Sequence, residues 1–99
     1  MFQTPTFEIT AKVWLWNAKG VWYFVTLPED ISTEIRNNYK QIAVMGMIPV
    51  TVTLGTSQWK TSLFNTKGKI AYILPLKKAI RTKENIQLDQ ILTIKIKPI

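Results

Sequence analysis

The stretch that decides the fold is ILPLKKAIRTKENIQLDQILTIKI, residues 73–96. It begins as an apolar strand that reaches Pro75, continues as a short basic helix that starts near Leu76, and turns at Leu88-Asp89 before an apolar closing strand. The first strand must enter a core, the helix must cover one of its open ends, and the closing strand must pair back. This order predicts a small β-rich domain, and it indicates no particular reaction.

Residues 7–16 alternate between apolar and outward-facing positions, which is typical of a half-buried strand. Two segments of the form Asn-x-x-Gly, residues 17–20 and 65–68, are predicted turns because Asn suits the first position and Gly the last. Residues 21–27 are apolar at nearly every position, so that strand is expected to be buried on both faces. Ile31, Ile35 and Tyr39 are four residues apart, as on the buried face of a helix.

Short strands with turns about every 8–12 residues, interrupted by only two helical segments, favour a barrel over βαβ units. We therefore predict one domain over residues 1–99 that is mostly β. It is expected to be a small closed or nearly closed β-barrel of about six to seven strands with two short helices.

The composition excludes several classes of function. The sequence contains neither His nor Cys, which removes the commonest metal ligands and the usual catalytic triads. No pair of carboxylates has a context that implies acid–base work, so we predict no enzyme, no catalytic residue, no metal and no cofactor. No apolar run approaches the ~18 residues of a membrane span, and the first six residues do not resemble a signal peptide. A cytoplasmic protein that does not contact a membrane is expected.

The net charge of +7 is unevenly distributed. Residues 1–59 carry four positive and four negative side chains, whereas residues 60–99 carry nine positive and two negative ones. Such asymmetry favours an anionic ligand or partner. The same lysines would also keep a small barrel soluble and protect its strand edges, so both interpretations stay open.

The densest basic cluster is Lys77, Lys78 and Arg81, and these are the candidate ligand-binding residues. On the predicted helix Lys77 and Arg81 would lie one turn apart on one face. This cluster could hold phosphates or an acidic protein, with further lysines extending the patch: Lys60, Lys67 and Lys69.

Aromatic side chains supply the second group of candidates. Trp14 and Trp16 lie on the outward face of the first predicted strand, where they could stack on bases or sugars or form an oligomer contact. Whether they are exposed stays open. Trp22 and Trp59 are expected to be buried.

The order of these elements resembles a known family. A hairpin at Asn17-Ala18-Lys19-Gly20-Val21-Trp22, a helix start at Leu27-Pro28, Val44-Met45-Gly46, and the run from Ile73 to Arg81 are together similar to the bacterial "domain of unknown function 1905" family. The resemblance covers roughly residues 6–96. It implies a compact β-barrel with short helices, found alone or ahead of a YdeI/OmpD-associated segment, and no catalytic residues.

The C-terminal unit also resembles half of a swapped-hairpin (AbrB-like) DNA-binding domain, through Pro75, Lys77, Lys78 and Arg81. The favoured prediction is a non-catalytic binding or interaction module with an unknown and possibly anionic ligand, or a protein partner. The alternative is a DNA-binding regulator of the swapped-hairpin type that uses the basic C-terminal half. Nucleic acid is thus possible as a partner but not favoured, and the oligomeric state stays open.

Overall fold

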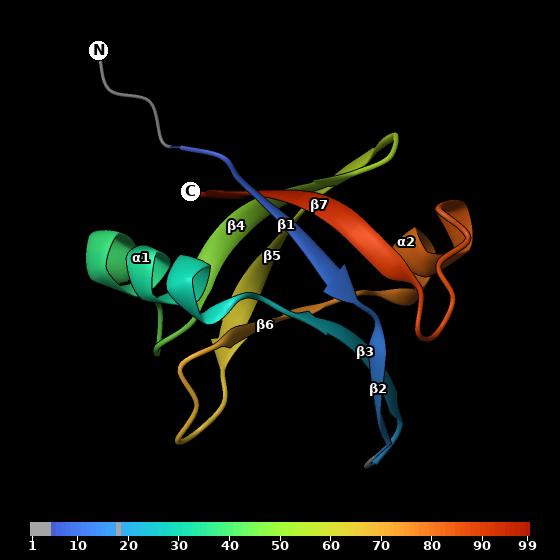
Figure 1. Ribbon diagram of the computed structural model, residues 1–99, viewed down its shortest axis with the longest axis horizontal. Helices are drawn as coiled ribbons and strands as arrows, with labels where there is room; N and C mark the ends of the chain where they lie inside the picture. Colours follow the sequence, from blue (N-terminus) through green and yellow to red (C-terminus); the bar gives the residue numbers. More distant parts are fainter. Residues whose placement is uncertain (1–4, 18) are drawn as a thin grey trace.

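The computed structural model describes residues 5–17 and 19–99. Residues 1–4 of the predicted domain and Ala18 of the first predicted turn lie outside the described residues. The described chain is mostly β, with seven strands curled into a nearly closed barrel that remains open, and with helices beside it (Figure 1). This confirms the predicted fold class.

One antiparallel sheet has the strand order β1-β7-β4-β5-β6-β3-β2. The strands are β1 (Phe7–Lys12), β2 (Trp14–Asn17), β3 (Val21–Thr26), β4 (Ile48–Leu54), β5 (Ser57–Asn65), β6 (Tyr72–Pro75) and β7 (Ile91–Pro98). The helices are α1 (Glu29–Tyr39), the 3-10 turn η1 (Lys40–Ile42) and α2 (Lys78–Lys83).

The single strand predicted over residues 7–16 is two strands, with a break at Val13. The backbone N–H of Val13 donates to the Gln90 carbonyl (2.9 Å), and its carbonyl accepts from the Asp89 N–H (3.0 Å). Before this point the chain pairs with β7, and after it the chain pairs with β3. The break lets one stretch of chain form both edges of the sheet, which is why the sheet curls nearly shut.

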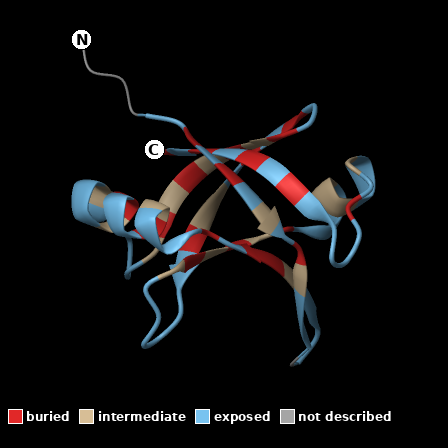
Figure 2. Cartoon of the chain, in the orientation of Figure 1, coloured by how far each residue is buried: buried red, intermediate tan, exposed pale blue. Residues whose placement is uncertain are grey.

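The core lies inside this curled sheet. Along β4 every second residue is buried, from Ile48 to Leu54, and β7 alternates in the same way (Figure 2). β7 pairs with β4 on one edge and with β1 on the other, so both edges of this closing strand are paired with strands of the same chain. Burying alternate apolar side chains from most of the strands is the main source of stability for such a fold.

Helix α1 packs with Ser32 and Ile35 buried, while Ile31 and Tyr39 are partly buried. This confirms the apolar face predicted from the four-residue spacing. The hydroxyl of Ser32 accepts a hydrogen bond from the Tyr72 backbone N–H (3.0 Å), which joins α1 to β6. No helix in the described part of the chain is long and apolar enough to cross a membrane.

The hairpin of β2 and β3 extends beyond the body of the barrel (Figure 1). As a result, Val21 and Trp22 are 56% and 51% exposed, and β3 contributes only Val25 to the core, with Tyr23 packed against it. The predictions that Trp22 is buried and that residues 21–27 are buried on both faces are therefore wrong. Trp59, in the middle of β5, is buried as predicted.

Candidate functional site

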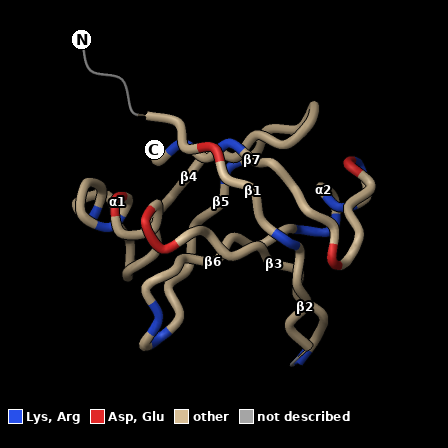
Figure 3. The backbone as a smooth tube through the Cα atoms, viewed as in Figure 1, with Lys and Arg blue, Asp and Glu red and all other residues tan. Residues whose placement is uncertain are grey.

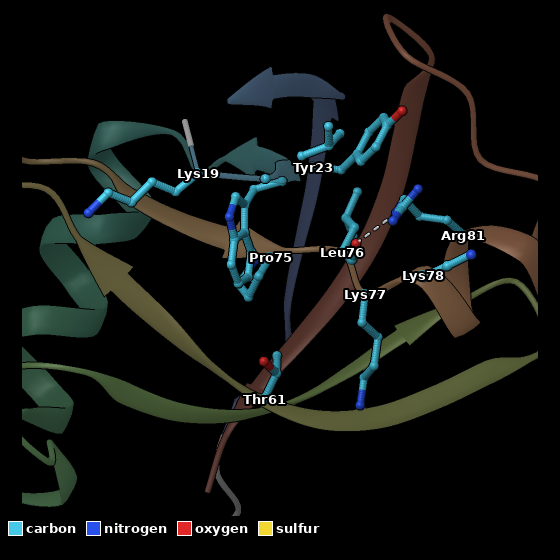
Figure 4. A pocket seen from close by; sticks show the side chains of 11 residues that line it. Lys19, Tyr23, Thr61, Pro75, Leu76, Lys77, Lys78 and Arg81 are labelled. Atoms are coloured by element: carbon cyan, nitrogen blue, oxygen red, sulfur yellow. Dashed lines mark hydrogen bonds between the residues drawn. The ribbon is translucent and has the colours of Figure 1, made fainter. Parts of the chain in front are cut away.

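A pocket of about 370 Å³ lies between the β2–β3 hairpin and the start of α2 (Figure 4). The predicted residues Lys77, Lys78 and Arg81 all line it. The hairpin contributes the opposite wall, and Thr61 of β5 also lines the pocket. Segments far apart in the sequence thus enclose one hollow.

Arg81 is held in place on the inner side of α2. Its Nε donates a hydrogen bond to the Leu76 carbonyl (3.0 Å), and its guanidinium carbon lies 4.0 Å from the centroid of the Tyr23 ring. The Leu76 backbone N–H in turn donates to the Tyr23 carbonyl (2.8 Å). A cation over an aromatic face is favourable, and the planar guanidinium stacks well there. The positively charged guanidinium of Arg81 is therefore held in a fixed position in the wall of the pocket.

The lysines of the pocket lie at its exposed rim. Helix α2 begins at Lys78, and Lys77 precedes it in an extended conformation (φ −70°, ψ 157°), so the prediction that Lys77 and Arg81 share one helical face is wrong. Lys19 lines the pocket from the hairpin on the other side, and its side chain extends away from the α2 residues (Figure 4). Among the described residues, no Asp or Glu lines the pocket. Four positively charged residues therefore line one hollow whose described lining contains no carboxylate.

The chain matches the model of a known protein family. A family model described as "Domain of unknown function (DUF1905)" matches residues 10–96. The chain belongs to this family. No curated protein matches it. The matched part of this DUF1905 domain contains every residue that lines the pocket.

Trp14 and Trp16 of the DUF1905 domain do not line the cationic pocket but lie beside it. The indole N–H of Trp14 donates to the Thr26 hydroxyl (2.8 Å), and the rings of Trp14 and Trp16 lie 5.1 and 6.4 Å from that of Phe24. Trp16 is 53% exposed, whereas Trp14 is partly buried. The structure thus gathers the three predicted basic residues in one site and puts both tryptophans on the neighbouring surface.

Sequence reasoning missed Lys19, Trp22 and Tyr23 as lining residues of the pocket. Lys19 belongs to the electrically neutral part of the sequence, and nothing in that part indicates which turn approaches α2. Lys60, expected to extend the basic patch, is exposed but does not line the pocket. Its neighbour Thr61 does, because successive residues of a strand face opposite sides of the sheet. Along the backbone, Figure 3 marks Lys and Arg positions at the start of α2, at the hairpin tip and at the β5–β6 turn.

The carboxylate nearest to α2 in sequence has a structural role. Glu84, just after α2, accepts hydrogen bonds from the Ser57 hydroxyl (2.5 Å) and the Thr56 hydroxyl (3.2 Å). The Ser57 bond is the main reason that the pKa of Glu84 lies below its ordinary value, and desolvation partly opposes it. In the described ranges, 5–17 and 19–99, no three His, Cys, Asp or Glu side chains are grouped so that they could hold a metal ion.

Proposed function

We propose that this DUF1905 domain is a non-catalytic binding module that takes an anionic ligand in the pocket between the β2–β3 hairpin and α2. The observation that carries the proposal is the lining: Lys19, Lys77, Lys78 and Arg81 all contribute to it, and no carboxylate among the described residues neutralises them within the wall. Like charges gathered in a hollow raise the local positive potential and favour an anion over bulk water.

The aromatic walls support the same proposal. Trp22 is half-exposed at the pocket, and Tyr23 is covered by the Arg81 guanidinium. An anion that also carries a flat or apolar group could contact both the lysines and the Trp22 ring. The absence of His and Cys from the sequence is the reason that we propose binding and not catalysis.

The swapped-hairpin DNA-binding alternative has less support and stays a prediction. It requires a second chain to complete the C-terminal unit, whereas β7 already has a partner strand of its own chain on each edge. Concentration-dependent dimerisation in sedimentation velocity, with duplex DNA bound only by the dimer, would favour that alternative. A cytoplasmic location also remains a prediction, to be checked by cell fractionation.

The test is an NMR titration of the 15N-labelled chain with pyrophosphate. We expect shifts in the backbone signals of residues 77–81 and in the indole signal of Trp22, with the signal of the buried Trp59 indole unchanged. Replacing Lys77 and Lys78 by Ala should weaken binding by roughly tenfold or more, since each hydrogen bond to a charged group contributes about 1.5–3 kcal/mol.

The matched control is Lys95→Ala with Lys97→Ala. These lysines are exposed on β7, and this pair of changes alters the net charge equally but leaves the pocket intact. Equal weakening in both double variants would mean that pyrophosphate senses only the net charge. That result, or the absence of shifts around the pocket at millimolar pyrophosphate, would refute the proposal.

A further inference from the structure

Three hollows follow one another across the outer face of β2, β3 and β6. The cationic pocket and an apolar hollow of about 260 Å³ share Trp22 and Pro75 in their walls. The apolar hollow shares Ile73 with a third one, of about 270 Å³, to which Trp14 and Lys69 contribute. We call this continuous surface the binding track. From one end to the other it presents Lys77 and Lys78, then Trp22, Trp16 and Phe64, and finally Lys69.

The middle of the binding track is aromatic and open to solvent. Trp16, Trp22 and Phe64 are 53%, 51% and 37% exposed. Trp16 and Trp22 are directly opposite each other on β2 and β3, so their side chains lie on the same face of the hairpin. Phe24, beside them on this face, is only 4% exposed, and its ring packs at a tilt against those of Trp14 and Trp16. The contact with Phe24 therefore orders the exposed Trp16 ring before a ligand binds.

The charge of the binding track is positive at both ends. Lys19, Lys77, Lys78 and Arg81 line one end, and Lys69 lines the other. None of the three hollows has an Asp or Glu in its described lining. A complementary ligand must therefore carry negative charges that are separated by flat or apolar groups.

We propose that the binding track holds a single-stranded nucleic acid, with phosphates at the lysines and unpaired bases stacked on Trp16 and Trp22. This inference rests on the proposed function, because the cationic pocket supplies the phosphate contacts at one end of the binding track. A single strand carries one phosphate per nucleotide and presents the faces of its bases, which is what aromatic side chains on a positively charged surface bind. A duplex hides those faces within its own stack. An acidic peptide matches the charge but does not offer a regular series of flat rings.

The experiment measures binding of fluorescein-labelled oligonucleotides of about ten nucleotides, a length within the usual site size of small barrels. Oligo(dT) and oligo(rU) distinguish DNA from RNA, a duplex of the same length tests strandedness, and a labelled poly-glutamate peptide tests an acidic protein segment. We expect either single strand to bind at least tenfold more tightly than the duplex or the peptide. Binding should quench tryptophan fluorescence, because bases stack on the exposed indoles.

The variants separate stacking from charge. Trp22→Ala should weaken oligonucleotide binding by roughly fivefold or more and leave the salt dependence unchanged, since stacking carries no counterion release. Replacing Lys77 and Lys78 by Ala should reduce the slope of log K against log salt by about 1.4, the value for two phosphate contacts on a single strand. Ile91→Ala, at an exposed apolar position on β7 outside the track, and the Lys95, Lys97 double variant are the matched controls. Circular dichroism verifies that each variant folds.

The outcomes distinguish this inference from the proposed function. If pyrophosphate shifts the signals of the cationic pocket but neither single strand binds, the nucleic-acid inference is wrong and the anion-binding proposal stands. If neither pyrophosphate nor oligonucleotide binds, both fail. Equal or tighter binding of the duplex or of poly-glutamate, or a Trp22→Ala variant that binds single strands as well as the parent chain, also overturns the inference.

Discussion

The carboxylate of Glu84 accepts a hydrogen bond from the hydroxyl of Ser57 at 2.5 Å, and this bond joins the end of α2 to the start of β5. Ser57 is 2% exposed, so its hydroxyl depends on this partner. The bond fixes the far end of the short helix whose first residues line the cationic pocket. It therefore links the stability of the barrel to the placement of the candidate site.

Because of the Glu84–Ser57 hydrogen bond, we predict that part of the free energy of unfolding depends on pH in the acidic range. The folded-state pKa of Glu84 is lowered, so the unfolded chain binds the proton more readily and this contribution is present above the ordinary value of 4.5. It is lost as the pH falls from about 4.5 through the folded-state pKa. Glu84→Gln should therefore make Tm depend less steeply on pH in this range. Thermal unfolding between pH 3 and 7, followed by circular dichroism, measures the difference.

Ser57→Ala is the matched check on that prediction. It removes the bond that lowers the pKa and keeps the carboxylate, so it should flatten the same part of the profile. Unchanged pH profiles in both variants would show that Glu84 titrates alike in the folded and unfolded chains, contrary to the expectation.

Gly55, in the β4–β5 turn, is predicted to be coupled to Glu84. Its φ of +59° disfavours a side chain, and a Cβ there would lie 2.1 Å from Oε1 of Glu84. Gly55→Ala should cost about 1–2 kcal/mol from the backbone conformation, with a further loss because Glu84 must move away from Ser57. Gly46 is the control, since it has φ +81° but no atom within 4 Å of an added Cβ.

Urea denaturation of the single and double variants measures this coupling. We expect Gly55→Ala and Glu84→Gln together to destabilise the chain less than the sum of the separate effects. Gly46→Ala and Glu84→Gln should be additive. If the effects of Gly55→Ala and Glu84→Gln on the unfolding free energy were additive too, Glu84 would move away from Ser57 at no cost in stability.

Ser32 is predicted to stabilise the packing of α1 against β6. Its hydroxyl, which is fully buried, accepts a hydrogen bond from the Tyr72 N–H. Ser32→Ala leaves this backbone donor without its partner, and an unsatisfied buried donor costs about 1–3 kcal/mol. Thr33→Ala, at the exposed neighbouring position, should change the unfolding free energy by less than about 0.5 kcal/mol. Equal effects in urea denaturation would contradict this role for the hydroxyl.

The planar shape of the Arg81 guanidinium, and not only its charge, is predicted to contribute to stability and to pyrophosphate binding. Arg81→Lys keeps the positive charge but loses the planar contact with Tyr23 and the Nε hydrogen bond to Leu76. We expect a loss of about 1 kcal/mol in unfolding free energy and weaker pyrophosphate binding than in the parent chain. Lys78→Arg, at the exposed rim of the same pocket, should leave both quantities nearly unchanged. Identical stability of Arg81→Lys and the parent would show that the stack is dispensable.

The sequence by itself determined the elements that depend on local pattern. Alternation over residues 7–12 predicts β1, the spacing of Ile31, Ile35 and Tyr39 predicts the buried face of α1, and the run from Ile73 to Ile96 predicts the closing strand–helix–strand unit. Periodic burial and turn chemistry are carried by neighbouring residues, so they can be read without knowing the partners. The basic cluster of Lys77, Lys78 and Arg81 was visible for the same reason.

Only the tertiary structure decided which distant segments meet. The break at Val13 follows from the change of partner strand from β7 to β3, because the alternation continues through it without interruption. Trp22 is exposed because its hairpin extends beyond the barrel, although its sequence reads as a buried strand. Lys19 lines the same pocket as the basic cluster of α2 only because β3 pairs with β6, the strand that precedes this helix. Long-range pairing sets these relationships, and no local pattern records it.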